Sequence, residues 1–168
     1  MQKNFIFSDT ETTGLREKDF IQIIQSASIL TNESFERIDA QNIESRPLPW
    51  VVPQPGAYLV HKKISSLDSN ISHYQMMKDI YDTWEKWSDD KQSIFITYNG
   101  HQFDEELYRR QFYWNLLPPY ITNTNGNGRS DLYFLILLVS YLYPDFIKFN
   151  MNNYCLLYTS DAADDTSG

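Results

Sequence analysis

Apolar residues along the first half of the chain gather in short runs that are typical of strands. Four runs predict strands: 5–9, 21–30, 36–45 and 93–98. We expect a hairpin turn at Asn32–Glu33, and Asn99–Gly100 stops the fourth run. The prolines between positions 47 and 55 exclude a central strand from that stretch, which we interpret as an extended loop.

Helical spacing of apolar residues begins near residue 65. Three segments predict helices: 65–87, 103–117, and the apolar run from Leu132 to Tyr143. In the first, Ile80, Trp84 and Trp87 form a stripe that we assign to the core. The third is capped by Ser130 or Asp131 and is ended by Pro144. With about 12 residues it is shorter than the roughly 20 that a membrane span needs, so we predict a buried helix.

This order of elements predicts an α/β or α+β layer fold, with helices packed on a mixed sheet. The chain has 168 residues, which suits one domain, and 42% of them are apolar, which is enough for a sizeable core. Its formal net charge of −8 excludes a protein that coats nucleic acid through a general excess of Lys and Arg. Because the N-terminus lacks a signal-peptide core, we expect a soluble, cytoplasmic protein without membrane contact.

The last residues depart from the pattern of the rest. Residues 155–165 resemble, codon for codon, the translation of a transposase-type sequencing adapter. We therefore expect 155–168 to be a non-native tail and the natural sequence to be interrupted near Tyr154; the alternative is an ordinary acidic tail. Without its three Asp residues the 22 acidic residues become 19, and the net charge becomes −5. The tail also holds Cys155, the single cysteine, so no disulfide framework is predicted.

Acidic side chains follow two of the predicted core strands. Asp9 and Glu11 are two residues apart at the end of the first strand, where alternation places both on one face. Asp104 follows the fourth strand and opens a helix. Clustered carboxylates repel one another, and hard cations such as Mg²⁺ or Mn²⁺ relieve that repulsion. The alternatives are solvated acids in a turn for the first pair and a favourable helix-dipole position for Asp104.

Two motifs around these acids resemble a known family. Phe7–Gly14 resembles the first motif of the DEDD 3′→5′ exonucleases, a ribonuclease H-like group, and Tyr98–Asp104 resembles their second motif. The run from Phe103 to Tyr120 is similar to bacterial exonuclease I of the DEDDh branch, as are 53–57 and 129–132. The resemblance extends over roughly residues 4–143.

The resemblance implies a fold and a reaction. The fold would be ribonuclease H-like, a mixed central sheet with flanking helices, with 1–154 as a partial exonuclease domain that is incomplete at its C-terminus. The reaction would be two-metal-ion hydrolysis at the 3′ end of single-stranded DNA, with Mg²⁺ as the metal, Mn²⁺ as a substitute, and nucleoside 5′-monophosphates as products. Asp9 would bridge both ions, Glu11 would hold the ion that activates water, and Asp104 would help to hold the second.

The resemblance also assigns substrate contacts. Four residues after the acids would meet the 3′-terminal nucleotide: Thr12, Thr13, Gly14 and Leu15. Phe103 would pack under the terminal base, Arg109 would contact phosphate and Tyr120 would stack on the strand. Ordinary packing is the alternative for Leu15, stapling of the helix for Phe103, and a solvated surface position for Arg109 and Tyr120.

The third motif of the family, His-x-x-x-x-Asp, is missing. Five residues after His61, His73 and His101 stand Ser66, Lys78 and Glu106. We therefore expect the fourth carboxylate and the general base to lie beyond Tyr154 in the uninterrupted gene, and this chain to be inactive. Two other functions stay open: a proofreading-type or RNA-directed DEDD exonuclease, and a non-catalytic nucleic-acid-binding module.

Overall fold

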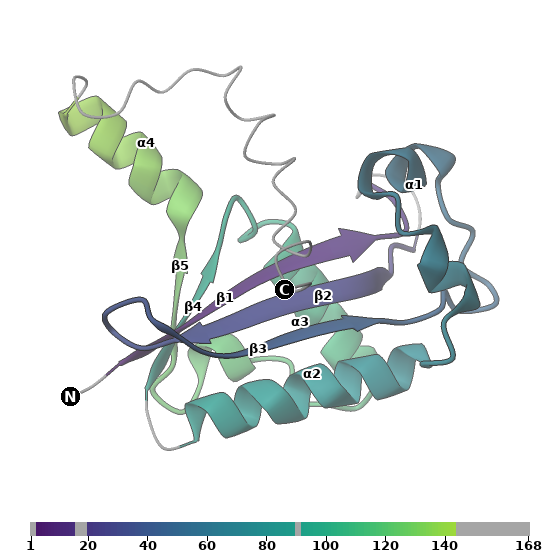
Figure 1. Cartoon of the computed structure of the whole chain (residues 1–168), viewed down its shortest axis with the longest axis horizontal. Helices are drawn as coiled ribbons and strands as arrows, with labels where there is room; N and C mark the ends of the chain where they lie inside the picture. The colour runs from purple at the N-terminus through teal and green to yellow at the C-terminus, as the bar shows by residue number, and fades with distance from the viewer. Residues whose placement is uncertain (1–2, 16–19, 90–91, 144–168) are drawn as a thin grey trace.

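The computed structural model describes residues 3–15, 20–89 and 92–143, and a five-stranded mixed sheet is its centre (Figure 1). The strands are β1 (Asn4–Thr12), β2 (Ile23–Thr31), β3 (Arg37–Glu44), β4 (Ser93–Thr97) and β5 (Gly128–Asp131). Their order in the sheet is β3-β2-β1-β4-β5. β1 pairs antiparallel with β2 and parallel with β4, so the strand that carries Asp9 and Glu11 lies in the middle of the sheet.

Two of the helices build the core with the sheet. The helices are α1 (Pro55–His61), α2 (His73–Ser88), α3 (Asp104–Trp114) and α4 (Leu132–Leu142), with 3-10 turns η1 (Ile64–Asp68) and η2 (Ile121–Asn123). α2 and α3 pack against the same face of the sheet (Figure 1). Trp84 of α2 is almost fully buried and contacts the rings of Phe95, Tyr108 and Phe112. The predicted Trp84/Trp87 stripe is therefore core, as expected.

The predicted strands and helices are present in the predicted order. The structure adds two elements that were not predicted, α1 and β5. The prediction of one helix over 65–87 is partly wrong, because the chain forms η1 first and starts α2 only at His73, after the Ser72 N-cap. The proline-rich stretch ends in the short helix α1, which begins at Pro55 because a proline at the first helical position needs no hydrogen-bonded N–H. β5 lies in a stretch that the sequence pattern assigned to a loop and a cap.

α4 differs from the prediction of a buried helix. It contains no buried residue, and Phe134, Leu135 and Leu138 are each about half exposed. In Figure 1 it extends away from the sheet beyond β5. Its apolar sequence thus has no matching packing surface within the described part of the chain. None of the described helices is long and apolar enough to cross a membrane. The predicted tail, 155–168, lies outside the described residues.

Candidate active site

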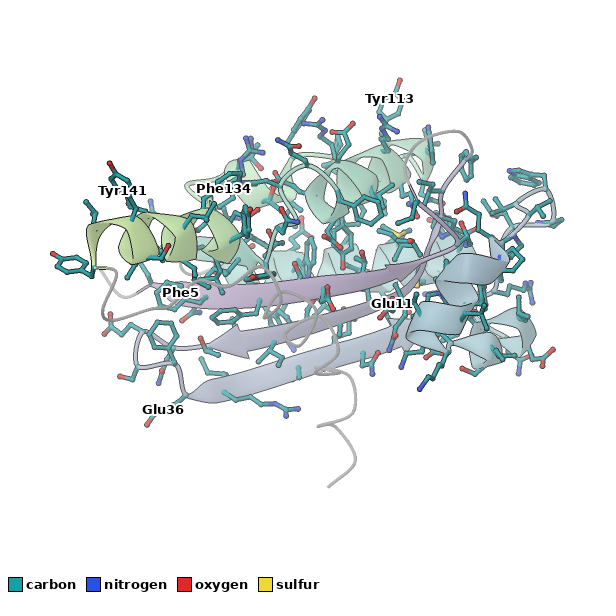
Figure 2. All side chains as sticks on the ribbon, turned by 90° about the horizontal axis from the view of Figure 1, so that it is seen from above. Phe5, Glu11, Glu36, Tyr113, Phe134 and Tyr141 are labelled. Carbon is teal, nitrogen blue, oxygen red and sulfur yellow. The ribbon has the colours of Figure 1, made fainter. Side chains whose placement is uncertain are left out.

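The side chains of β1 alternate between the two faces of the sheet. Ile6 is fully buried in the core beneath α2 and α3, and alternation places Ser8 and Thr10 on that same face. The same alternation assigns Asp9 and Glu11 to the opposite face of β1. Phe5 shares their face, and Figure 2 labels Phe5 and Glu11 near the two ends of β1. Asp9 is exposed and Glu11 is half-buried.

Asp104, the first residue of α3, is brought to β1. Its side chain is buried, and its Oδ1 accepts a hydrogen bond from the Thr10 hydroxyl. Burial raises the pKa of Asp104 to about 7; the Thr10 hydrogen bond lowers this pKa, and the nearby charge of Asp9 raises it further. The second motif therefore reaches β1 at Thr10, and convergence of the Asp104 and Asp9 carboxyl groups on one metal site stays a prediction.

The donor chemistry of this pair fits a hard divalent cation. A buried carboxyl such as Asp104, whose pKa is raised by burial and by a nearby carboxylate, is stabilised as a carboxylate when a cation binds to it. Within residues 3–15, 20–89 and 92–143, however, no three His, Cys, Asp or Glu side chains are grouped closely enough to hold a metal. The three-ligand set of Asp9, Glu11 and Asp104 thus stays a prediction.

A buried carboxylate shapes the loop that leads to Asp104. Asp131, at the end of β5, accepts hydrogen bonds from the Asn99 N–H at 2.7 Å and the His101 N–H at 3.1 Å. Asn99 has a φ of 55°, and a Cβ on Gly100 would lie 2.8 Å from Asp104 Oδ2. The backbone is therefore folded tightly around the Asp104 carboxyl. From the sequence, Asp131 was predicted only as a helix cap, which it also is, through the Tyr133 N–H.

His101 takes part in a charged cluster beside this loop. Its Nε2 lies 3.3 Å from Glu105 Oε2, and its Nδ1 lies 3.9 Å from Asp131 Oδ2. Glu105 is also paired with Arg129. Among the described residues, His101 Nε2 has no hydrogen-bond partner.

The residues after the acids are held by contacts within the protein. Thr12 and Thr13 are buried, and the Thr12 hydroxyl donates to the Gly14 carbonyl at 2.9 Å. The Thr13 N–H donates to the Gln22 carbonyl at 2.9 Å, and the Gln22 N–H donates back to the Thr13 hydroxyl at 3.0 Å. Leu15 is 72% exposed. Of these four residues, Leu15 is therefore the one whose side chain reaches solvent for a ligand.

His61 lies behind this segment. Its Nε2 is 3.2 Å from the Thr12 carbonyl oxygen, and its Nδ1 accepts from the Lys63 N–H at 3.0 Å. Together these contacts fix the neutral tautomer with the proton on Nε2. Burial lowers the pKa of His61, which favours the same neutral form. Sequence reasoning had no signal for this contact, because it joins residues 49 positions apart.

The remaining predicted contact residues lie on or near α3. Phe103 is partly buried and packs against the core, which favours its alternative role of stapling the helix. The guanidinium of Arg109 lies 5.8 Å from the centre of the Tyr120 ring and forms an ion pair with Glu106. Tyr120 is 52% exposed. Arg109 and Tyr120 thus form one surface unit, a cation placed on an aromatic ring.

Comparison with known proteins identifies relatives in sequence. No protein-family model matches the chain. It is 30% identical over 153 residues to exodeoxyribonuclease I of Buchnera aphidicola subsp. Acyrthosiphon pisum, covering 89% of the chain and 36% of that protein. The corresponding protein of Buchnera aphidicola subsp. Schizaphis graminum is 28% identical over 157 residues, covering 91% and 32%. The chain thus spans about a third of the length of the curated relatives that it matches.

Solved structures of exonuclease I are also similar to this chain in fold. The zinc-bound form of an E. coli ExoI–ssDNA complex matches with a TM-score of 0.79 and 25% identity, over 90% of the chain and 32% of that protein. E. coli exonuclease I in complex with a dT13 oligonucleotide matches with a TM-score of 0.78 and 25% identity, over 89% and 32%. The predicted mixed sheet with flanking helices is therefore confirmed. Over the residues that it shares with these proteins, the chain is exonuclease I-like in sequence and in fold.

Proposed function

We propose that this chain is part of a 3′→5′ exonuclease that removes nucleoside 5′-monophosphates from single-stranded DNA. The observation that supports this most directly is the buried Asp104 carboxyl, held by Thr10 next to Asp9 on the central strand. A purely structural protein gains nothing from a buried carboxyl beside a second one, because each raises the cost of ionising the other. The relatives named exodeoxyribonuclease I support the same reaction class.

In this proposal Asp9 and Asp104 hold divalent cations together with Glu11. Bound Mg²⁺ or Mn²⁺ supplies a water of lowered pKa and stabilises charge on the leaving oxygen. The protein's part is placement: Thr10 orients the Asp104 carboxyl, and Asp131 fixes the loop that precedes it. Arg109 and Tyr120 offer a charge and a ring to the strand.

We further propose that residues 1–168 bind a 3′ end without hydrolysing it. No histidine in the sequence is followed by Asp at the spacing of the third motif. His61 contacts the Thr12 carbonyl oxygen, and His101 lies beside Glu105 at the start of α3. Loss of general-base help alone typically costs about 10²–10⁴-fold in rate.

The test uses residues 1–168 with 3′-labelled single-stranded DNA and a matched RNA, each with Mg²⁺ or Mn²⁺. We expect metal-dependent binding that prefers DNA, is lost in Asp9→Ala, and is not accompanied by release of mononucleotides. Metal-independent binding that Asp9→Ala leaves unchanged would support the binding-module alternative, and a preference for RNA would support the RNA-directed one. Mononucleotide release that disappears in Asp9→Ala would show that the chain is active and the expectation of inactivity wrong.

A further inference from the structure

The loop before α1 is hydrogen-bonded to the turn that follows Asp9 and Glu11. The Gln54 N–H donates to the Thr13 carbonyl at 2.7 Å. The Gln54 side-chain Oε1 accepts from the Leu15 N–H at 3.1 Å. One residue therefore binds the backbone on both sides of Gly14.

Gly14 is packed directly beneath the Gln54 side chain. A Cβ added to Gly14 would lie 2.5 Å from Gln54 Cδ and 2.8 Å from Cγ. Real Cβ atoms do not make contacts this short, so a larger residue at position 14 shifts the Gln54 side chain. Because Gly14 has no side chain, the Gln54 side chain can pack directly against its backbone.

The segment that carries Gln54 is constrained at both ends. Gln54 lies between Pro53 and Pro55, has extended backbone angles, and is the N-cap position of α1. At the other end of α1, His61 contacts the Thr12 carbonyl oxygen at 3.2 Å. Pro53 and Pro55 have fixed φ angles, and a residue before proline is restricted to extended backbone, so the Gln54 backbone has little freedom to move away from the turn.

We propose that Gln54 is a positioning residue for the 3′-terminal nucleotide, acting through the backbone of Gly14 and Leu15. It holds Leu15 at the end of the turn with its side chain in solvent, where it is available to an unstacked terminal base. This inference rests on the proposed function. It adds that the neutral side chain of Gln54, 39 positions away from Leu15, sets the placement of the terminal nucleotide without touching it.

The experiment measures binding of two single-stranded oligonucleotides in Ca²⁺, one complete and one with an abasic 3′-terminal residue. Gln54→Leu keeps most of the side-chain volume but removes the acceptor for Leu15, whereas Gln54→Glu retains an acceptor at the same place. We expect the wild type to prefer the complete oligonucleotide, Gln54→Leu to lose that preference by about fivefold, the effect of one hydrogen bond, and Gln54→Glu to retain it. Binding of the abasic oligonucleotide should not change in Gln54→Leu.

A second measurement follows the Leu15 amide by hydrogen exchange, which should accelerate in Gln54→Leu and not in Gln54→Glu. Gly14→Ala serves as an independent variant, which should reproduce the loss of preference by displacing Gln54. A preference that survives in Gln54→Leu, or equal weakening of both oligonucleotides, would overturn the inference while the proposed function stands. A wild type that binds neither oligonucleotide would contradict the proposed function, and this inference with it.

Discussion

At the scale of single residues, the site is defined by polar groups that are costly to bury. Asp104 is 7% exposed and accepts from Thr10. Its folded-state pKa of about 7 lies above the ordinary value of 3.8, so the folded protein binds the Asp104 proton more tightly than the unfolded chain does. In the absence of metal, the contribution of Asp104 to stability is therefore complete below pH 3.8 and is lost as the pH rises through 7.

Replacement of Asp104 by Asn should stabilise the metal-free protein. Asn keeps the shape and an oxygen that can accept from Thr10, but it carries no charge to bury. At pH 8 we expect the free energy of unfolding to increase by about 4 kcal/mol, and at pH 4 to change little. Urea unfolding in EDTA at both pH values measures this.

Exposed Asp9 supplies the matched control, because Asp9→Asn removes one charge of the pair without removing a buried one. It should stabilise the protein less than Asp104→Asn does. A destabilising effect of Asp104→Asn at pH 8 would contradict the raised pKa.

The acids of the site could be predicted from the sequence, whereas the residues that hold them could not. Asp9, Glu11 and Asp104 stand in short motifs next to apolar runs. Thr10 and Gln54 act through partners 94 and 39 positions away in the sequence. Polar residues of these types are common on surfaces, and only the fold shows which of them meet a partner.

At the scale of elements, α2 shows what periodicity predicts and what it misses. Its apolar stripe predicted the core face correctly, but no pattern in the sequence indicated that its first residue, His73, is buried. His73 is 3% exposed, and neither ring nitrogen has a hydrogen-bond partner in the structure. Burial lowers the pKa of His73 from 6.5 to about 4.

This histidine should make α2, and the fold with it, sensitive to mild acid. Between pH 6.5 and 4 the unfolded chain takes up a proton at His73 and the folded protein does not, so stability falls as the pH falls through this window. The loss at pH 4 should reach about 3 kcal/mol. In His73→Leu the decrease between pH 7 and pH 4 should be smaller by that amount, as measured by urea unfolding at a series of pH values.

Tyr74, the exposed neighbour of His73, offers a control for the loss of a ring from the same turn. The pH dependence of Tyr74→Leu should match that of the wild type. If His73→Leu loses as much stability between pH 7 and pH 4 as the wild type and Tyr74→Leu do, a group other than His73 is responsible for the acid sensitivity.

α1 and β5 were not predicted, for two different reasons. α1 has seven residues and no buried one, so no apolar stripe marks it in the sequence. β5 has four residues and follows an Asn/Gly-rich loop; its pairing with β4 supplies hydrogen bonds that no local pattern records. Elements this short are specified by their neighbours more than by their own propensity.

At the scale of the whole molecule, α4 leaves apolar surface exposed. Leu135 and Leu138 are 50% and 53% exposed, and Leu142 is 56% exposed. The sequence predicted that this helix is apolar but could not show that nothing in the described residues covers it. Exposed apolar surface of this kind favours association between copies.

We expect residues 1–168 to self-associate through α4. Leu135→Glu combined with Leu138→Glu should shift the protein toward monomer, which sedimentation at several concentrations measures. Leu116→Glu is the control, since Leu116 is 94% exposed but lies outside α4. Equal effects of the two changes would show that the added charge, and not the α4 surface, is responsible.

The position of β1 in the sheet also determines when the site forms during folding. β1 and β2 pair as neighbours in the sequence, so Asp9 and Glu11 are placed on a local hairpin that closes quickly. The parallel partner β4 pairs Asn4 with Ser93, and closing so long a stretch of chain is entropically slower. Asp104 follows β4 and cannot reach Thr10 before that pairing exists. We therefore expect Asp9 and Glu11 to be in place on the hairpin first, and Asp104 to join them only once the long-range pairing of β1 with β4 has formed.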